Sequence, residues 1–136
     1  MDIIFEILFE TKYKSIAWAS THQFLYIAWK SFTTSDKYRE AAMKQVQYVS
    51  EKKAAKILYD LTQFKGISPE DQKWALEVHI PALIEAGLRK TAIVYPRDIF
   101  SKVAMDTVIK QSKGTTVLTS RNFFDQEEAI RWLGQD

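Results

Sequence analysis

The chain has 136 residues, of which 46% are hydrophobic and 26% charged, with only 4 Gly and 3 Pro. This length and composition indicate one globular domain over 1–136 and exclude a disordered or collagen-like chain. The 19 basic and 17 acidic residues leave a formal net charge of +2 and are scattered, so we expect no nucleic-acid partner.

Several kinds of site are disfavoured by residue types alone. The sequence has no cysteine, which excludes disulfides, thiol nucleophiles and thiolate metal sites. Its two histidines, His22 and His79, are distant in the chain and make a poor metal site, so we expect no metal or cofactor. No apolar run approaches the roughly 20 residues that span a bilayer, and the start lacks the basic region of a signal peptide. We therefore expect a cytoplasmic protein with no membrane span.

Three strands are predicted in the first third of the chain. Over 3–9 the odd positions are all apolar, while Glu6 and Glu10 fall on the other face, which is typical of a half-buried strand. A second strand is expected over 16–19 and a third over 24–29. The short connections between them predict antiparallel hairpins.

A helix and a central strand are predicted next. Ser35 is expected to be the N-cap of a helix that ends near Lys52. Its inward side chains are expected to be Tyr38, Ala42, Val46 and Val49. The apolar run over 57–61 has bulky side chains for both faces, which indicates a central parallel strand.

The following helix is expected to begin at Ser68, with Pro69 in its first turn, and to end near Ala86 with Gly87 as its cap. Pro81 removes a backbone donor and is expected to bend it. Its sheet-facing row is expected to contain Leu76, Ile80 and Leu83.

The last third predicts a strand over 91–95, a helix over 97–110, a strand over 115–119 and a helix that begins at Asp125. The expected fold class is therefore α/β. It has a single mixed sheet, antiparallel in its amino-terminal part and parallel in its carboxyl-terminal part, with about four flanking helices. The strands over 57–61 and 91–95 are expected to be adjacent and parallel.

A site is expected beyond the carboxyl end of the central strand, because ligands and partners of open α/β sheets bind there. Asp60 and Thr62 lie at this tip, and Ser68 begins the next helix. Asp60 has the chemistry of a general base, but a carboxylate in this position more often accepts backbone N–H bonds from the next loop.

Trp74 and Val78 form a second apolar stripe on the predicted helix, away from its sheet-facing row. Such residues usually belong to the core, but a helix on a sheet needs only one apolar stripe. The second stripe is therefore a hypothetical contact surface. An apolar small molecule held between Trp74, Val78, Phe100 and the sheet is the alternative.

The order of the predicted elements can be compared with known families together with five stretches: 59–62, 67–74, the Ile80-Pro81 pair, 91–94 and 123–125. In these features the chain resembles the small bacterial SpoIIAA-like, or STAS-like, proteins over nearly its whole length. It implies a mixed sheet with flanking helices, a fold used by anti-sigma-factor antagonists and transporter tails and related to CRAL-TRIO lipid-transfer domains. It also implies a non-catalytic regulatory domain.

The antagonists carry a phosphorylatable serine in an Asp-Ser-Ser-Gly motif at the start of the helix after the central strand. Ser68 is the matching residue, but it stands in Gly66-Ile67-Ser68-Pro69, without the acidic residue, the second serine or the glycine. Because these motif residues are missing, the sequence does not favour a phosphorylation switch. We expect Ser68 to be an N-cap.

Three functions follow in order of preference. The first is a regulatory domain, a monomer or weak homodimer, that contacts a protein partner. Its expected binding residues are Asp60, Thr62, Ser68, Trp74 and Val78. The second is a carrier of an apolar small molecule or lipid, and the third is an enzyme that uses Asp60.

Overall fold

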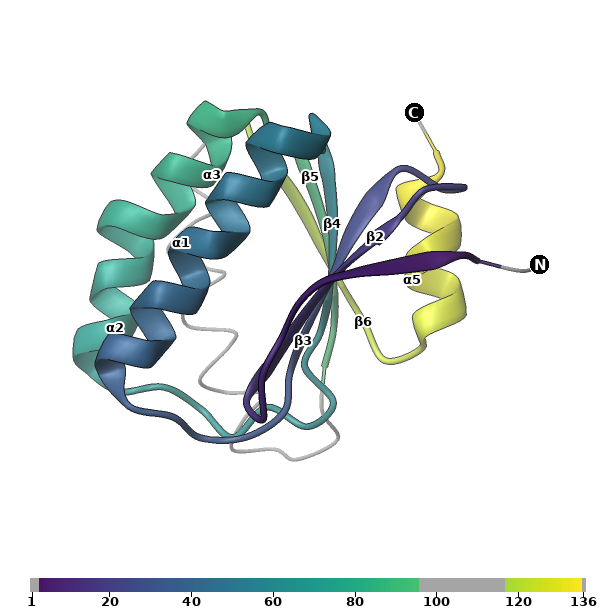
Figure 1. Ribbon diagram of the computed structural model, residues 1–136. Coiled ribbons are helices and arrows are strands. Elements are labelled where there is room, and N and C mark those ends of the chain that lie inside the picture. Colours follow the sequence, from purple (N-terminus) through teal and green to yellow (C-terminus); the bar gives the residue numbers. More distant parts are fainter. Residues whose placement is uncertain (1–2, 96–116, 136) are drawn as a thin grey trace.

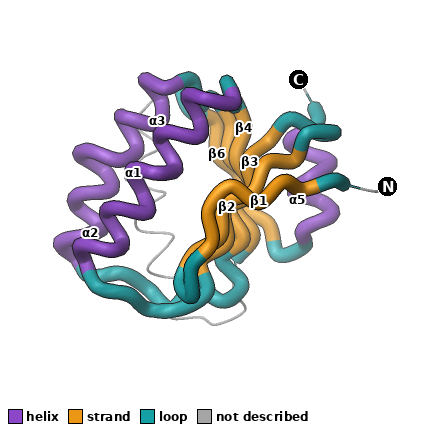
Figure 2. Tube along the Cα trace, viewed as in Figure 1, coloured by secondary structure: helices purple, strands orange, loops and turns teal. Residues whose placement is uncertain are grey.

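A six-stranded sheet forms the centre of the molecule (Figures 1 and 2). The computed structural model describes residues 3–95 and 117–135. The strands lie side by side in sequence order and are β1 (Phe5–Glu10), β2 (Lys14–Ala19), β3 (Phe24–Trp29), β4 (Lys56–Asp60), β5 (Lys90–Val94) and β6 (Thr119–Phe123). β1, β2 and β3 are antiparallel, and β3 to β6 are parallel. This confirms the expected mixed α/β sheet, in which β4 and β5 are adjacent and parallel.

Helices cover both faces of the sheet, as Figure 1 shows. One face carries α1 (Ser35–Lys52) and a helix composed of α2 (Pro69–Trp74), a π-helical turn (Ala75–His79) and α3 (Ile80–Ala86). The other face carries α5 (Gln126–Leu133). The part of the chain that the structure describes thus has three helices where about four were expected, and the helix predicted over 97–110 lies outside it.

The core is divided by the sheet into two apolar clusters. The larger lies under α1 and α3 and includes Ile27, Ile57 and Leu83. The smaller lies under α5 and includes Leu58 and Ala129. Because β4 contributes to both clusters, its run of bulky residues is explained by burial on two faces, as predicted.

β1 departs from the alternation expected of it. The pairing with β2 shifts between Ile7 and Phe9, which marks a bulge at Leu8. Phe5 and Ile7 therefore point to the α5 side of the sheet, where they are 40% and 58% exposed, while Leu8 and Phe9 pack against the cluster under α1. The expectation that residues 3, 5, 7 and 9 share a buried face was wrong because the extra residue reverses the alternation.

α1 begins one residue differently from the prediction. Ser35 is its first helical residue, and Thr34 is the N-cap, without a side-chain cap bond. The Ser35 hydroxyl instead donates to Asp71 Oδ1 at 2.6 Å, which joins α1 to α2. The expected end at Lys52 is confirmed.

The long second helix is continuous, but it widens near its middle. The Ile80 N–H donates to the Ala75 carbonyl, five residues earlier, in place of the usual four. Pro81 follows directly and has no N–H to donate, so the wider turn accommodates the proline that was expected to bend the helix. The extra residue in the turn also moves the buried row to Ala75, His79 and Leu83. Of the residues predicted to face the sheet, Leu83 is buried, whereas Leu76 and Ile80 are only partly buried.

β6 lies four residues later than the strand predicted over 115–119. Residues 117 and 118 are not in a strand, and Thr119 pairs with Lys90 at the start of β6. As an edge strand, β6 buries little besides Phe123, so its sequence is polar and lacks the apolar pattern of a strand. The apolar residues Val117 and Leu118 precede β6, and they led the sequence analysis to place the strand too early.

The predicted caps of the other helices are confirmed. The Ser68 Oγ accepts the Asp71 N–H at 3.1 Å, and Asp125 Oδ2 accepts the Glu128 N–H at 3.3 Å. Gly87 ends α3 with φ +124°, a backbone conformation that favours glycine.

Candidate binding site at the tip of the sheet

Three spaces surround the end of β4, and each has its own set of lining residues. The tip hollow, of about 440 Å³, lies between the loops that follow β3 and β4. Its lining residues are Trp29, Ser31, Phe32, Thr33, Ser35, Tyr38, Phe64, Lys65, Gly66, Ile67, Ser68 and Asp71. The face hollow, of about 390 Å³, lies on the α5 side and includes Phe5, Ile7, Tyr26, Asp60 and Thr62. The inner cavity, of about 100 Å³, lies between the helices and the sheet.

Asp60 is held by three hydrogen bonds at the end of β4. Its Oδ1 accepts the Thr62 N–H at 3.0 Å and the Thr62 hydroxyl at 2.6 Å. Its Oδ2 accepts the Tyr26 hydroxyl from β3. Burial, the hydrogen bond to Asp60 and the charge of that carboxylate raise the pKa of Tyr26, so the phenol remains a donor. The carboxylate thus fastens the next loop to the sheet, as expected for a strand-tip aspartate.

Ser68 lies at the surface and lines the tip hollow, while Asp60 and Thr62 line the face hollow. Asp71, whose N–H is capped by Ser68, is buried. Its Oδ1 accepts hydrogen bonds from the Ser35 hydroxyl at 2.6 Å and from Arg39 Nε at 3.0 Å. These bonds fix the beginning of α2 against α1. The three residues predicted to form one site at the tip therefore line two separate hollows.

Phe32 is a tip residue that the sequence analysis did not single out. It is 71% exposed, the largest exposed fraction among the large apolar side chains described, and it lines the tip hollow. A recognisable signal was present, because Phe32 is the one apolar residue in the polar segment 30–36 between a strand and a helix. Exposed aromatic side chains beside a hollow are typical of binding surfaces.

Trp74 and Val78 lie in different environments. Trp74 is partly buried, stacks on the His79 ring at 5.8 Å and meets the edge of Tyr38 at 6.1 Å. Arg39 lies over the Trp74 ring at 5.2 Å. Val78 is 43% exposed, and neither residue lines any of the three spaces. Trp74 thus packs between α2 and α1, whereas Val78 is at the surface.

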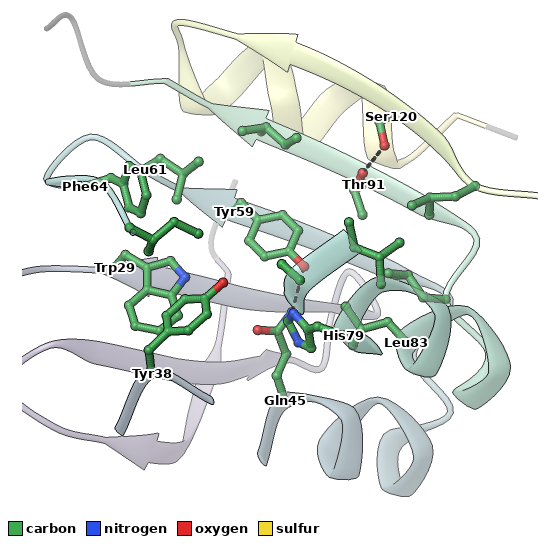
Figure 3. A pocket seen from close by; sticks show the side chains of 16 residues that line it. Trp29, Tyr38, Gln45, Tyr59, Leu61, Phe64, His79, Leu83, Thr91 and Ser120 are labelled. Atoms are coloured by element: carbon green, nitrogen blue, oxygen red, sulfur yellow. Dashed lines mark hydrogen bonds between the residues drawn. The ribbon is translucent and has the colours of Figure 1, made fainter. Parts of the chain in front are cut away.

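Polar groups are buried beside the inner cavity (Figure 3). Lys14 is fully buried, and its Nζ donates to Gln45 Oε1 at 2.8 Å and to the Ala41 carbonyl at 3.3 Å. Gln45 Nε2 in turn donates to the Tyr59 hydroxyl at 2.7 Å. Burial lowers the pKa of Lys14 well below its ordinary value, because these partners are neutral and compensate a charge poorly.

His79 lies on the helix side of the same cavity and is only 7% exposed. Its ring is hydrogen-bonded to the Ala42 backbone, and its Nε2 has no partner among the described residues. Burial is the main cause that lowers the pKa of His79, to about 3, with a smaller contribution from the charge of Lys14. The imidazole is therefore neutral near pH 7.

These buried polar residues were also missed from the sequence, although their positions carried a signal. Lys14 precedes Ile16 and Trp18 on the inward face of β2, and Gln45 stands four residues before the buried Val49 on α1. A polar residue at an inward position of an apolar stripe marks a buried polar group. His79, between Ala75 and Leu83, has the same pattern.

The mixed sheet with helices on both faces and the capped helix after β4 define an α/β domain of the expected class. The SpoIIAA-like family matches the chain over residues 24–134, from β3 to the end of α5. The chain belongs to the SpoIIAA-like family. Domains of this family are in general regulatory or binding modules and typically bind protein partners. Comparison with curated proteins finds no match.

Within 3–95 and 117–135, no helix is both long and apolar enough to cross a membrane. The same ranges contain no group of three or more His, Asp or Glu side chains placed to hold a metal ion.

Proposed function

We propose that this protein is a non-catalytic regulatory module that binds a protein partner at the tip of its sheet, through the tip hollow. The observation that carries the proposal is Phe32, a 71% exposed aromatic ring on the wall of a hollow of about 440 Å³. Large exposed aromatic side chains that adjoin a hollow are frequent anchors of protein interfaces.

The construction of the hollow supports the same proposal. Its two loops are fixed from below by hydrogen bonds of Asp71 to Ser35 and Arg39, which join the beginnings of α1 and α2. On the far side of β4, the bonds of Asp60 to Thr62 hold the start of the second loop. A surface whose backbone is held in place loses less conformational entropy on binding.

The engagement of Asp60 favours this function over catalysis. Both carboxylate oxygens already accept hydrogen bonds from Tyr26 and Thr62. A general base at this position would have to leave these partners to take a proton from a substrate. We therefore assign Asp60 and Thr62 to the support of the tip and Ser68 to its rim.

The proposal is tested by affinity capture from cells with the tagged wild-type chain and two variants, Phe32→Ser and Val78→Ser. Both positions carry exposed apolar side chains, but only Phe32 lines the tip hollow. We expect a partner that the wild type and Val78→Ser retain and Phe32→Ser loses, while all three proteins melt at similar temperatures. Equal retention by both variants would contradict the proposal.

A further inference from the structure

The face hollow lies on the α5 side of the sheet, beside that helix. α5 packs mainly on β4, β5 and β6, and it leaves the neighbouring part of the same face open (Figure 1). Ser15, Ala17 and Ala28 line the hollow with short side chains from β2 and β3, and Phe5 and Ile7 line it from β1. Its volume of about 390 Å³ is within the range of about 300 to 1,000 Å³ that is usual for small-molecule sites.

Asp60 contributes a charge to this hollow that no cation in the described part of the chain offsets. It is partly exposed, and its hydrogen-bond donors, from Tyr26 and Thr62, are all neutral. Asp71, by contrast, has Arg39 Nε at 3.0 Å. Among the described residues, no Lys, Arg or His forms an ion pair with Asp60. A partly buried carboxylate that only neutral donors contact favours a cation beside it.

The hydroxyls next to Asp60 offer acceptors to a ligand. Tyr26 and Thr62 both donate their hydroxyl hydrogens to the carboxylate, so that each oxygen keeps only lone pairs for a further bond. Lys30 is the other charged residue among the described lining, and its Nζ lies 3.7 Å from Glu10 Oε1. Because Glu10 offsets Lys30, the excess charge of the hollow is that of Asp60. A positively charged group with several N–H donors is complementary to this end.

The rest of the lining suits an apolar ring. The Phe5 and Tyr26 rings, with their centroids 5.4 Å apart, both line the hollow, and Ile7 lies on β1 two residues after Phe5. These side chains provide apolar contact area, and the faces of aromatic rings attract cations rather than anions.

We propose that the face hollow binds a small organic amine, a single apolar ring that carries a protonated primary amino group. The ammonium donates to Asp60 and to the hydroxyl oxygens of Tyr26 and Thr62, and the ring packs between Ile7 and Ala28. This site differs from the apolar carrier considered from the sequence, because Trp74 and Val78 do not line the hollow. Phe100, the remaining residue of that hypothesis, lies outside the described residues.

The amine site does not depend on the proposed protein contact at the tip. Phe32, the anchor of that contact, does not line the face hollow, and Ile7, Ala17 and Ala28 do not line the tip hollow. Failure of one proposal therefore leaves the other standing.

The test compares three probes with the same ring and different charges: phenethylamine, phenethyl alcohol and hydrocinnamate. Methyl NMR titrations of the full chain measure the dissociation constant of each. We expect phenethylamine to shift the methyl signals of Ile7, Ala17 and Ala28 and to bind about fivefold more tightly than the alcohol, the worth of one partly screened ion pair. Hydrocinnamate should bind most weakly, because its carboxylate meets that of Asp60.

Two variants assign this preference to the charge of Asp60. Asp60→Asn should bring the affinity for phenethylamine down to that for the alcohol, since the amide keeps an acceptor for Thr62 without the charge. Glu70→Gln removes an exposed carboxylate that does not line the hollow, and it should keep the wild-type preference.

Two further measurements keep the result decisive if Asp60→Asn folds poorly. In the wild type, raising the salt concentration to about 1 M should remove most of the preference for the amine, because it shortens the screening length to about 3 Å. Ala28→Leu, which fills the hollow, should abolish binding of the amine and the alcohol. Equal affinity of the wild type for these two probes, a preference that persists in Asp60→Asn, or binding that persists in Ala28→Leu would each overturn the proposal.

Discussion

Single buried polar residues govern how this domain responds to pH. His79 is neutral in the folded state because burial lowers its pKa to about 3, whereas an unfolded histidine titrates near 6.5. Below pH 6.5 the unfolded chain therefore binds a proton that the folded chain does not. The stability that His79 contributes is present above pH 6.5 and is lost as the pH falls toward 3.

Between pH 7 and pH 4 the free energy of unfolding of the wild type should fall by about 3 kcal/mol more than that of His79→Phe, because only the wild type has this titration. Urea unfolding at several pH values gives the difference between the two proteins and cancels the carboxylates that both share. A difference that stays constant with pH would show that His79 takes up its proton over the same pH range in the folded and unfolded states, and would contradict the lowered pKa.

Residues of this kind also show the limit of sequence analysis. A strand or helix pattern identifies inward positions from apolar residues, and a polar residue among them indicates a buried polar group without identifying its partner. Lys14 and His79 are tolerated inside because each finds a neutral backbone acceptor, on Ala41 and Ala42 respectively, which only the packing of α1 supplies. Such partners lie far away in the chain and leave no local signal.

At the scale of elements, the beginning of the helix after β4 is held by the Ser68 cap. Ser68 Oγ accepts the Asp71 N–H at 3.1 Å and is otherwise exposed. Ser68→Ala should lower the free energy of unfolding by about 1 kcal/mol. Ser68→Asp should leave it close to the wild-type value, because aspartate caps about as well and its charge favours the helix amino terminus. Urea denaturation of the three proteins measures both values.

The same variants separate a cap from a switch. If Ser68→Asp keeps its stability but no longer captures the partner that the wild type binds, the serine controls recognition and the assignment as a cap alone is insufficient. Unchanged capture together with the loss of stability in Ser68→Ala agrees with a structural cap at the rim of the tip hollow.

The elements themselves were predicted well where local chemistry determines them. The central strand, the caps at Ser68 and Asp125 and the glycine at the end of α3 all follow from side-chain types at single positions. The bulge in β1, the π turn before Pro81 and the polar edge strand β6 were missed. Each depends on pairing or packing with another element, so the alternation of apolar residues misplaced them.

For the whole molecule, the tip hollow lies between the loops that follow β3 and β4. α1 and α2 begin beside the tip, with Asp71 bonded to Ser35 and Arg39, and the loop after β4 closes the tip hollow. The inner cavity reaches the same region through side chains common to both, such as Trp29 and Phe64. The rule for parallel strands predicts a site at this end from the sequence, whereas the hollows depend on how the layers pack.

The central claim is that a protein partner sits on the tip hollow, and site-specific photocrosslinking tests it most directly. A photoreactive phenylalanine analogue is placed at position 32, and in a matched control at position 78, in the full chain expressed in cells. The account predicts a discrete crosslinked product with a protein from position 32, and no such product from position 78. Crosslinking of the same protein from position 78 with none from position 32 would contradict it.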